Sequence, residues 1–347
     1  MSATTTTTTA PIVLVTGGNG FVGTATVLEL IKQGYKVKAT VRRQSSADAF
    51  NAKYPDAAAS IEWVLISSLT DLPAMTAAAH GVDYMMHLAS PYTLVVKDPV
   101  KDMLVPAIDG TLTALRAAKA NPRITRVVLT SSFAAMNSVL LGLRPGHTYS
   151  EADWNPATWE QAASSDHGGF IYCASKELAE HAAWEFMDKE KPGFTLSVFN
   201  PPMVYGPPLQ PFDSLEQLNE SVNNLWQLLS GNAKEMPFTG LPIFVDVRDL
   251  AHVQVAALKN PAAANQRYFT VGGAYTFDDV VRIAARAFPE QGARMTPVSG
   301  HEMPEYYGWD NSKIRRDFGI EFTPLEKTVT DMAKVLYEAE AKFAKSA

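Results

Sequence analysis

Three glycines follow a short apolar run near the start of the chain. The stretch IVLVTGGNGFVG places Gly17, Gly20 and Gly23 between that run and a helical pattern. Gly17 permits a tight turn, Gly20 lets backbone amides approach a bound anion, and Gly23 allows the helix to pack closely on the strand. An anion is favoured there because the first N–H groups of a helix are unpaired and its dipole is positive at that end. The spacing predicts a strand–turn–helix unit that binds a diphosphate; the alternative is a glycine-rich turn without a ligand.

The first 200 residues alternate between short apolar runs and longer helical patterns. The runs predict strands at Ile12–Thr16, Lys36–Val41, Ile61–Ile66, Tyr84–Leu88, Arg126–Thr130 and Thr195–Asn200. Helical patterns fall between them, near Phe21–Gln33, Met103–Ala120 and Ile171–Met187. Strands that alternate with helices form a parallel sheet covered on both faces, which binds ligands at the carboxyl ends of its strands. The predicted fold class is therefore α/β, with a Rossmann-type doubly wound parallel sheet.

The character of the chain changes after Asn200. The stretch NPPMVYGPPLQPF is too rich in proline to continue as a central strand, so the chain leaves the sheet there. Residues 244–258 and 267–271 predict a return to it as a helix and a late strand, and helical patterns dominate from Thr276 onward. We expect a nucleotide-binding domain over 11–200 plus about 241–272, and a smaller, mostly helical C-terminal substrate domain over about 201–240 plus 273–347.

Composition excludes several classes of protein. A formal net charge of -6 without a long basic run argues against nucleic acid and anionic membranes as partners. No stretch approaches the ~20 apolar residues that span a bilayer. Residues 1–10, MSATTTTTTA, have neither the apolar core of a secretory signal nor the arginines of a transit peptide, and we expect a disordered tail. The histidines show no metal-binding spacing, and a single cysteine suits a reducing compartment. We expect a cytoplasmic protein without a metal.

Two arginines follow the second predicted strand. Sites that select NAD place an acidic residue about 20 positions after the glycine turn, where it binds the ribose 2′-hydroxyl. This chain reads KATVRRQSS there, with Arg42 and Arg43 followed by Ser45 and Ser46 and no carboxylate. Guanidinium groups bind phosphate through paired hydrogen bonds. The pattern favours the 2′-phosphate of NADPH/NADP+ as the ligand; the alternative is a solvated arginine pair.

A tyrosine and a lysine lie four residues apart on the third helical pattern. This spacing places Tyr172 and Lys176 on one face of the helix. A tyrosine titrates at about pH 10, and a fixed ammonium nearby is expected to lower the pKa of Tyr172 toward the neutral range. Ser131 and Ser132 end the fifth strand, where a hydroxyl can donate to a carbonyl oxygen that gains charge. Cys173 is rotated by about 100° from Tyr172, so we expect its thiol to be a bystander.

The glycine turn, the strand-end serines and the tyrosine–lysine pair together resemble the extended short-chain dehydrogenase/reductase family. The resemblance covers nearly the whole chain, from TGGNGFVG through LTSS, YCASK and NPPMVYGP to VDVRDLAHVQVAAL. ATVRR, HLASP and PAIDGTLTALRAA are similar to the patterns of one branch. That branch holds dihydroflavonol reductases, cinnamoyl-CoA reductases and fungal-type carbonyl (methylglyoxal, aldehyde) reductases.

The resemblance implies roles for individual residues. Tyr172 would be the general acid, Lys176 the ribose ligand that tunes it, and Ser132 the donor that orients the carbonyl. The residues expected along the cofactor are Gly17, Gly20, Phe21, Val22, Gly23, Arg42, Arg43, Ala89, Thr130, Tyr172, Lys176, Pro201, Met203 and Val204. The residues expected in the substrate pocket are Tyr92, Phe133, Asn137 and Tyr205.

One departure from the family pattern concerns the adenine end of the cofactor. The family usually carries an aspartate after the third strand that contacts adenine, whereas LISSLTD places Ser67 or Ser68 there. Among other polar residues, His87 is expected as a packed core residue because it lies near the end of an apolar run. Asp246 and Asp249 are expected to cap the start of a helix.

We therefore predict an NADPH-dependent carbonyl reductase that transfers a hydride to an aldehyde or ketone and yields an alcohol, acting as a monomer or homodimer. Two other functions fit parts of the pattern. A nucleotide-sugar epimerase or dehydratase shares the fold and the tyrosine–lysine pair, but it retains a tightly bound NAD, which the arginines disfavour. A non-catalytic NADP(H) sensor typically lacks the tyrosine or the lysine, and this chain has both.

Overall fold

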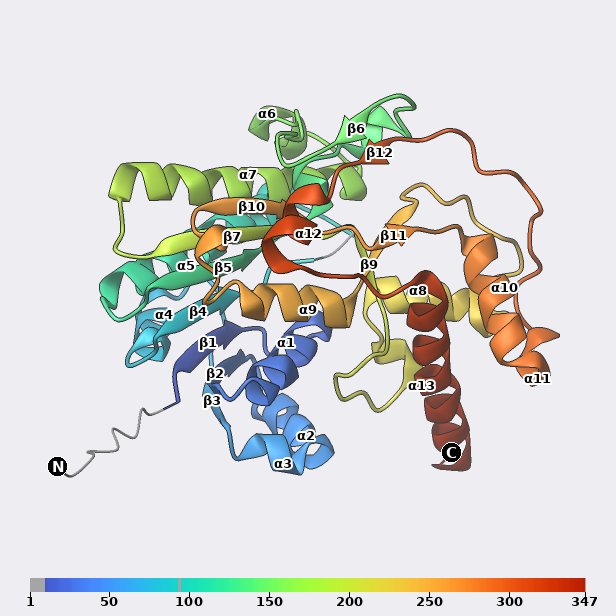
Figure 1. The fold of residues 1–347 in the computed structure, drawn as a ribbon, viewed down its shortest axis with the longest axis horizontal. Helices are drawn as coiled ribbons and strands as arrows, with labels where there is room; N and C mark the ends of the chain where they lie inside the picture. The colour runs from blue at the N-terminus through green and yellow to red at the C-terminus, as the bar shows by residue number, and fades with distance from the viewer. Residues whose placement is uncertain (1–9, 93–94, 347) are drawn as a thin grey trace.

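A seven-stranded sheet forms the centre of the computed structural model, which describes residues 10–92 and 95–346 (Figure 1). Its strands are β1 (Ile12–Thr16), β2 (Lys36–Val41), β3 (Ile61–Leu65), β4 (Tyr84–His87), β5 (Arg126–Thr130), β7 (Thr195–Asn200) and β10 (Gln266–Phe269). Their spatial order is β10-β7-β5-β4-β1-β2-β3, and every neighbouring pair is parallel. The strand order reverses between β1 and β4, which confirms the predicted doubly wound sheet and marks its ligand-binding edge.

The predicted strands and the observed ones nearly coincide. Four of them, β1, β2, β5 and β7, begin and end where the apolar runs begin and end. Two others, β3 and β4, each end one residue earlier than predicted. The predicted disordered tail lies outside the described residues, apart from Ala10.

Helices cover both faces of the sheet. One face carries α1 (Phe21–Lys32), α2 (Gln44–Lys53), α9 (Val247–Ala256) and α12 (Ser312–Phe318), and the other carries α4 (Leu72–Ala79), α5 (Val105–Ala120) and α7 (Gly168–Glu190). In β1, Val13 and Val15 pack on the first face while Leu14 packs on the second. Burial on both faces explains why the strands read as continuous apolar runs.

The helices differ from the prediction mainly at their ends. A π-helical segment, Val100–Leu104, precedes α5, so the predicted helix at Met103–Ala120 has an irregular start. The long helix α7 extends beyond the predicted Ile171–Met187 at both ends, and the His167 side chain accepts a hydrogen bond from the Phe170 N–H at 3.0 Å to cap its start. Short helices also occur at α3 (Pro55–Ala58), α6 (Trp159–Ala163) and α11 (Pro289–Gly292).

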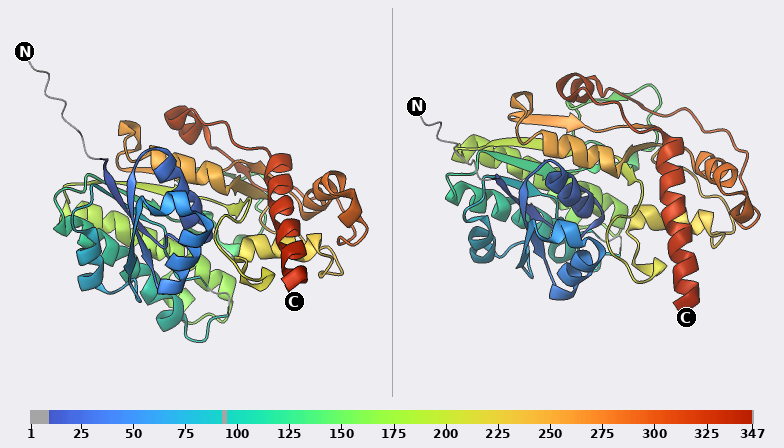
Figure 2. Two further views of the ribbon diagram at one scale, coloured as in Figure 1. Left: turned by 90° about the horizontal axis from the view of Figure 1, so that it is seen from below. Right: turned by 60° about the horizontal axis from the view of Figure 1, so that its bottom comes forward.

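A second apolar cluster lies beside the sheet. Its helices are α8 (Glu220–Leu229), α10 (Phe277–Ala287) and α13 (Leu325–Ser346), which pack through residues that include Leu225, Val280 and Leu336. Both views of Figure 2 show α13 next to α8, apart from the face that carries α4 and α5. We propose that these helices form the core of the smaller domain. The α12 segment, which falls within the range predicted for that domain, packs instead on the main sheet through Ile314.

A small three-stranded sheet lies between the main sheet and the cluster of α8, α10 and α13. One of its strands includes the first residues of the helix predicted over 244–258, so that prediction is wrong at its start. Its strands are β8 (Met203–Tyr205), β9 (Ile243–Asp246) and β11 (Gly273–Ala274), in the order β11-β9-β8. A separate two-stranded parallel sheet consists of β6 (Thr148–Tyr149) and β12 (Gly308–Trp309). The helix α9 starts only at Val247, because the four buried residues of β9 pair with strands distant in the sequence. Asp246 caps α9 as predicted, accepting a hydrogen bond from the Arg248 N–H at 2.9 Å.

Candidate active site

The glycine turn lies at the edge of the sheet where β1 ends. Gly17 has φ of +69°, a left-handed conformation that side chains disfavour. A Cβ atom on Gly23 would lie 2.0 Å from the Gly17 carbonyl oxygen, so only glycine lets α1 approach the turn. The first turn of α1, with Phe21 and Val22, therefore directs its unpaired N–H groups over the strand ends. These features fit a bound diphosphate.

Thr16 fixes the crevice between β1 and β4. Its hydroxyl oxygen accepts hydrogen bonds from the N–H groups of Leu88 and Ala89, each at 3.1 Å, and lies 2.9 Å from His87 Nδ1. Since that oxygen already accepts two hydrogen bonds, its own proton points to the imidazole. Burial, with Lys176 as a second cause, lowers the pKa of His87 to about 4, so His87 is a neutral packed residue as predicted.

Arg42 and Arg43 lie at the carboxyl end of β2 with exposed side chains. Arg43 occupies the residue before α2, and Ser45 and Ser46 lie in the first turn of that helix. Within the described part of the chain, neither guanidinium takes part in a hydrogen bond or ion pair. Unpaired cationic groups at the start of a helix fit a phosphate group.

The serines that replace the family's adenine-contacting aspartate are also exposed. Ser67 follows the end of β3, and the Ser68 hydroxyl lies 2.8 Å from the Thr70 hydroxyl. The Ser68 oxygen also accepts a hydrogen bond from the Thr70 N–H at 3.2 Å. Ser68 therefore shapes the turn before α4, while Ser67 is the residue on the exposed edge.

Ser132 and Tyr172 meet at the carboxyl end of β5. The Ser132 side chain lies close enough to the Tyr172 hydroxyl on α7 to lower its pKa. The Ser132 oxygen also accepts a hydrogen bond from the Ala134 N–H at 3.1 Å, which fixes its direction. The neighbouring Ser131 points to the other side and donates to Glu180 at 2.6 Å. Successive side chains of an extended segment alternate in direction, so Ser132 rather than Ser131 faces the tyrosine.

The pKa of Tyr172 departs from the prediction. Burial raises the pKa of the Tyr172 hydroxyl well above its ordinary value, and the nearby Ser132 side chain only partly opposes this. The expected lowering by Lys176 is not found, because burial has the largest effect and the other charged neighbours that act on this pKa, Cys173 and Tyr92, raise it further. Tyr172 is therefore protonated at neutral pH, which is the state that a proton donor needs.

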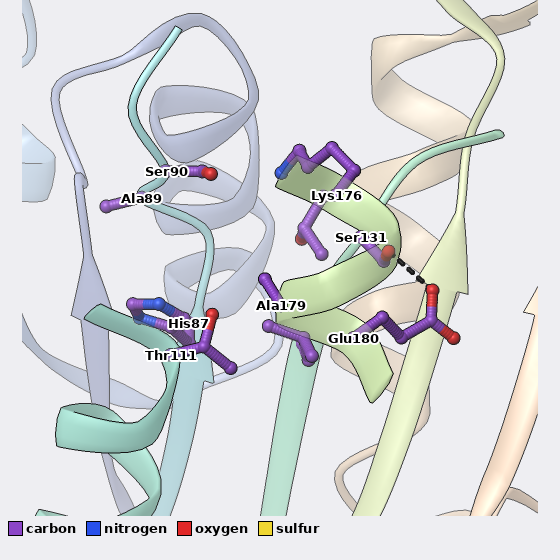
Figure 3. A pocket seen from close by; sticks show the side chains of 10 residues that line it. His87, Ala89, Ser90, Thr111, Ser131, Lys176, Ala179 and Glu180 are labelled. Carbon is purple, nitrogen blue, oxygen red and sulfur yellow. Dashed lines mark hydrogen bonds between the residues drawn. The ribbon is translucent and has the colours of Figure 1, made fainter. Parts of the chain in front are cut away.

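Lys176 lies one turn after Tyr172 and is buried, with 8% of its surface exposed. Burial lowers the pKa of Lys176 to about 8, and Glu180 partly restores it. Figure 3 shows its side chain extending toward Ala89 and Ser90 across a cavity that is also lined by His87 and Thr111. Among the described residues its ammonium has no hydrogen-bond partner. A buried and unpaired donor beside the glycine turn fits the hydroxyl groups of a ribose.

The other residues predicted along the cofactor line the same edge of the sheet. Ala89 lines the cavity and lies close to the glycine turn, since a Cβ placed on Gly17 would be 3.1 Å from the Ala89 Cβ. The Thr130 hydroxyl accepts a hydrogen bond from Gln254 at 2.7 Å. The Pro201 carbonyl accepts one from the Phe133 N–H at 2.8 Å, and Met203 and Val204 follow in β8.

The four residues predicted in the substrate pocket have different environments. Tyr92 is 49% exposed and lies with its ring against Tyr172. Phe133 is buried against Tyr149, Phe269 and Tyr307, and the side-chain oxygen Oδ1 of Asn137 accepts a hydrogen bond from the Tyr149 hydroxyl at 2.7 Å. Tyr205 is fully buried in the cluster of the smaller domain, with its hydroxyl 2.8 Å from that of Tyr275. Tyr205 is therefore a core residue and not part of the pocket, contrary to the prediction.

The comparisons with known proteins agree with this geometry. The family model described as "NAD dependent epimerase/dehydratase family" matches residues 13–272. The chain belongs to this family. The methylglyoxal reductase GRE2 of Saccharomyces cerevisiae, described as NADPH-dependent, is 33% identical over 95% of this chain and 99% of its own length. Cinnamoyl-CoA reductase 1 of Arabidopsis thaliana is 34% identical over 94% of this chain and 89% of its own.

A solved structure shows the same fold. The crystal structure of yeast methylglyoxal/isovaleraldehyde reductase Gre2, complexed with NADPH, has a TM-score of 0.83 and 29% identity, covering 95% of this chain and 99% of that one. The resemblance to the reductase branch of the family, stated from the motifs, is confirmed by these relatives.

Cys173 lies inside the protein and follows Tyr172 in the chain. It is 5% exposed, and burial raises the pKa of its thiol to about 11. Because the thiolate is the reactive form, this environment makes the thiol inert. The structure thus supports the prediction of a bystander. No group of three or more histidine, cysteine, aspartate or glutamate side chains suited to a metal ion occurs in the described residues, 10–92 and 95–346.

Sequence reasoning missed the buried polar residues that lie beneath Ser132 and Lys176. Glu180 and Arg267 form a buried ion pair at 2.5 Å, and Asn200 donates to Glu180 at 2.7 Å. The spacing of four residues between Lys176 and Glu180 was a usable signal, because such residues share a helix face. No local pattern could have indicated Arg267 or Asn200, since both meet α7 only in the folded chain.

Proposed function

We propose that the protein is an NADPH-dependent carbonyl reductase that converts an aldehyde or ketone to an alcohol. The observation that carries the proposal is the closeness of the Ser132 and Tyr172 side chains, one helical turn from the buried Lys176. This arrangement places two hydroxyl groups where one carbonyl oxygen can contact both. The names of the relatives, a methylglyoxal reductase described as NADPH-dependent and a cinnamoyl-CoA reductase, support the same activity.

The cofactor would bind along the edge described above. The N–H groups at the start of α1 would hold its diphosphate, and Arg42 and Arg43 would bind its 2′-phosphate. Lys176 would donate hydrogen bonds to the ribose next to the nicotinamide. When bound, NADPH supplies a hydride to the carbonyl carbon of the substrate.

The side chains of the protein supply the proton and stabilise the charge on the substrate oxygen. Ser132 donates a hydrogen bond to the carbonyl oxygen, which becomes more negative as the hydride arrives. Tyr172 is protonated at neutral pH because burial raises its pKa, and it transfers its proton to that oxygen. The ammonium of Lys176 then stabilises the negative charge left on the tyrosine oxygen. Above about pH 8 this ammonium is lost.

The test is NADPH oxidation, followed by absorbance, with a panel of aldehydes, α-dicarbonyls, aryl ketones and β-keto esters. We expect turnover with at least one class of carbonyl and a strong preference for NADPH over NADH. A protein that turns over no carbonyl while releasing stoichiometric NAD on denaturation would contradict the proposal and indicate an epimerase or dehydratase instead.

The cellular setting is part of the proposal. None of the helices in the described ranges is both long and apolar enough to span a bilayer. The chain has one cysteine and therefore cannot form an internal disulfide. A cytoplasmic enzyme that is a monomer or homodimer fits both features; light scattering of the purified protein and the location of a tagged copy test it.

A further inference from the structure

The carboxylate of Glu180 joins four elements beneath the catalytic residues. It lies on α7 one turn after Lys176 and is 1% exposed. One of its oxygens accepts hydrogen bonds from the Ser131 hydroxyl at 2.6 Å, next to the end of β5, and from the Asn200 amide at 2.7 Å, at the end of β7. The other accepts from Arg267 in β10 at 2.5 Å and from the Trp184 indole at 3.3 Å.

Two short routes connect this carboxylate to Ser132. Ser131, which binds it, is the adjacent residue in the chain. Asn200 donates both to Glu180 and, at 3.1 Å, to the Ser132 carbonyl oxygen. The helix that carries Glu180 also carries Tyr172 and Lys176. A movement of α7 along β5 would break these hydrogen bonds.

Arg267 pairs with the Glu180 carboxylate and is itself held by several contacts. Its guanidinium is 7% exposed and also donates to the carbonyl oxygens of Glu151 at 2.9 Å and Asp153 at 2.6 Å. It lies over the ring of Trp154 at 3.7 Å from the ring centre. A buried carboxylate is costly unless a cationic partner and further donors pair with it, and Arg267 is such a partner.

We propose that Glu180 is a positioning residue that holds the end of β5 in register with α7, so that Ser132, Tyr172 and Lys176 meet at the same substrate oxygen. This inference rests on the proposed reductase function and assigns a residue outside the catalytic trio to it. Figure 3 shows that the two neighbours on α7 point in different directions, because Lys176 extends toward Ala89 and Ser90 whereas Glu180 extends toward Ser131.

The charge of Glu180 has a second effect, on Lys176. Among the described residues, the titratable groups that line the same cavity as Lys176 are Glu180 on its own helix and His87 on β4, which is neutral because burial lowers its pKa to about 4. Glu180 itself faces Arg267 on β10 and Glu177 on α7. Glu180 raises the pKa of Lys176 against the larger effect of burial. Neutralising Glu180 therefore makes Lys176 lose its proton at a lower pH.

The test uses two variants with a matched control. Glu180→Gln combined with Arg267→Gln removes both buried charges, so that no unpaired ion destabilises the fold. Ser131→Ala removes one of the four hydrogen bonds and keeps every charge. The control is Arg126→Lys, because Arg126 is 8% exposed and donates to the Ala257 carbonyl at 2.6 Å from the opposite end of β5.

Two measurements decide the proposal, each on protein shown to be folded by circular dichroism. For the double variant we expect kcat to fall about tenfold to a hundredfold. The apparent pKa at which activity is lost on the alkaline side should also fall by about one unit. Amide exchange in the peptide over 131–137 should become about tenfold faster. Ser131→Ala should lower kcat less than the double variant and leave the alkaline apparent pKa unchanged. Arg126→Lys should change neither kcat nor the amide exchange of this peptide.

Three results would contradict the positioning role of Glu180 or the function on which it rests. Wild-type kcat, pH profile and exchange in a folded double variant would show that the ion pair only stabilises the fold. If the double variant does not fold, Ser131→Ala decides alone, and unchanged kcat and exchange would refute the register role. An absence of turnover in the wild-type protein would contradict the proposed reductase instead, and the exchange measurement would still decide whether Glu180 positions the end of β5.

Discussion

The ring of Tyr92 lies edge-on against the ring of Tyr172, with centroids 5.0 Å apart and an interplanar angle of 80°. Tyr172 is the proposed proton donor, and Tyr92 is 49% exposed beside it. Edge-to-face contact between aromatic rings is favourable and restricts the orientation of both. We propose that Tyr92 forms one wall of the substrate's approach to the Tyr172 hydroxyl.

Removing this wall should impair substrate binding. We expect Tyr92→Ala to raise the KM of the carbonyl substrate by up to about tenfold, because a contact of the substrate with this ring would be worth about 0.5–1.5 kcal/mol beyond its buried area. Tyr92→Phe keeps the ring and is the matched control. The measurement is steady-state kinetics together with NADPH affinity by fluorescence, which should change in neither variant. A Tyr92→Ala protein with the kinetics of Tyr92→Phe would exclude a role for the ring.

Tyr172→Phe should nearly abolish reduction. The change removes the donated proton and keeps the ring, so we expect a loss of about 10²–10⁴ in kcat with NADPH affinity preserved. Ser132→Ala should lower kcat by about 10²–10³, because its hydrogen bond strengthens as the oxygen gains charge. Turnover near the wild-type rate by a folded Tyr172→Phe protein would refute the mechanism.

Arg42→Asp should change the choice of cofactor. A carboxylate in place of an unpaired guanidinium repels the 2′-phosphate of NADPH and leaves NADH nearly unaffected. We expect the ratio of kcat/KM for NADPH to that for NADH to fall at least about tenfold. Arg286→Asp, an equal change of charge on the exposed face of α10, is the control. An unchanged ratio would shift the assignment to Arg43.

Cys173→Ser should leave turnover within about threefold of the wild-type rate. Its thiol is buried with a pKa raised to about 11, so it has no thiolate to contribute at neutral pH. A thiol-alkylating reagent should likewise fail to inactivate the folded enzyme. Loss of activity comparable to that of Tyr172→Phe would overturn the bystander assignment.

Glu177→Gln should stabilise the protein at alkaline pH. Burial, and then Glu180, raise the pKa of Glu177 to about 7, although Arg267 opposes this. Between the ordinary carboxyl pKa and about pH 7 the folded state holds a proton that the unfolded state has released, so wild-type stability falls as pH rises through this window. At pH 8 we expect the variant to gain on the order of 1–2 kcal/mol in free energy of unfolding, because solvent screens part of the effect.

Urea unfolding at pH 4.5 and pH 8 measures this difference. The gain should disappear at pH 4.5, where Glu177 is protonated in the folded wild-type protein. Glu185→Gln is the control, since Glu185 is exposed on the same helix and forms a surface pair with Lys189 at 2.8 Å. An equal gain at both pH values would indicate a packing effect without titration.

The sequence by itself was sufficient for most strands of the sheet and for the candidate residues at its carboxyl edge. Apolar runs bounded by polar residues marked β1, β2, β5 and β7 to the residue. The glycine spacing, the arginines after β2 and the pair Tyr172 and Lys176 were visible because each depends on residues close together in the chain. Local geometry of a turn or a helix face determines what such residues can do.

Contacts between distant residues were decided only by the tertiary structure. Ile243–Asp246 became a strand rather than the start of a helix because it pairs with β8 and β11, which no periodicity in its own residues announces. Tyr205 turned out to be a core residue because Tyr275, 70 positions later, meets its hydroxyl. Glu180 and Arg267 are 87 positions apart, and their pairing exists only once α7 packs across the sheet onto β10. Burial and long-range pairing belong to the folded chain as a whole, so the environment of these side chains follows from packing rather than from local sequence.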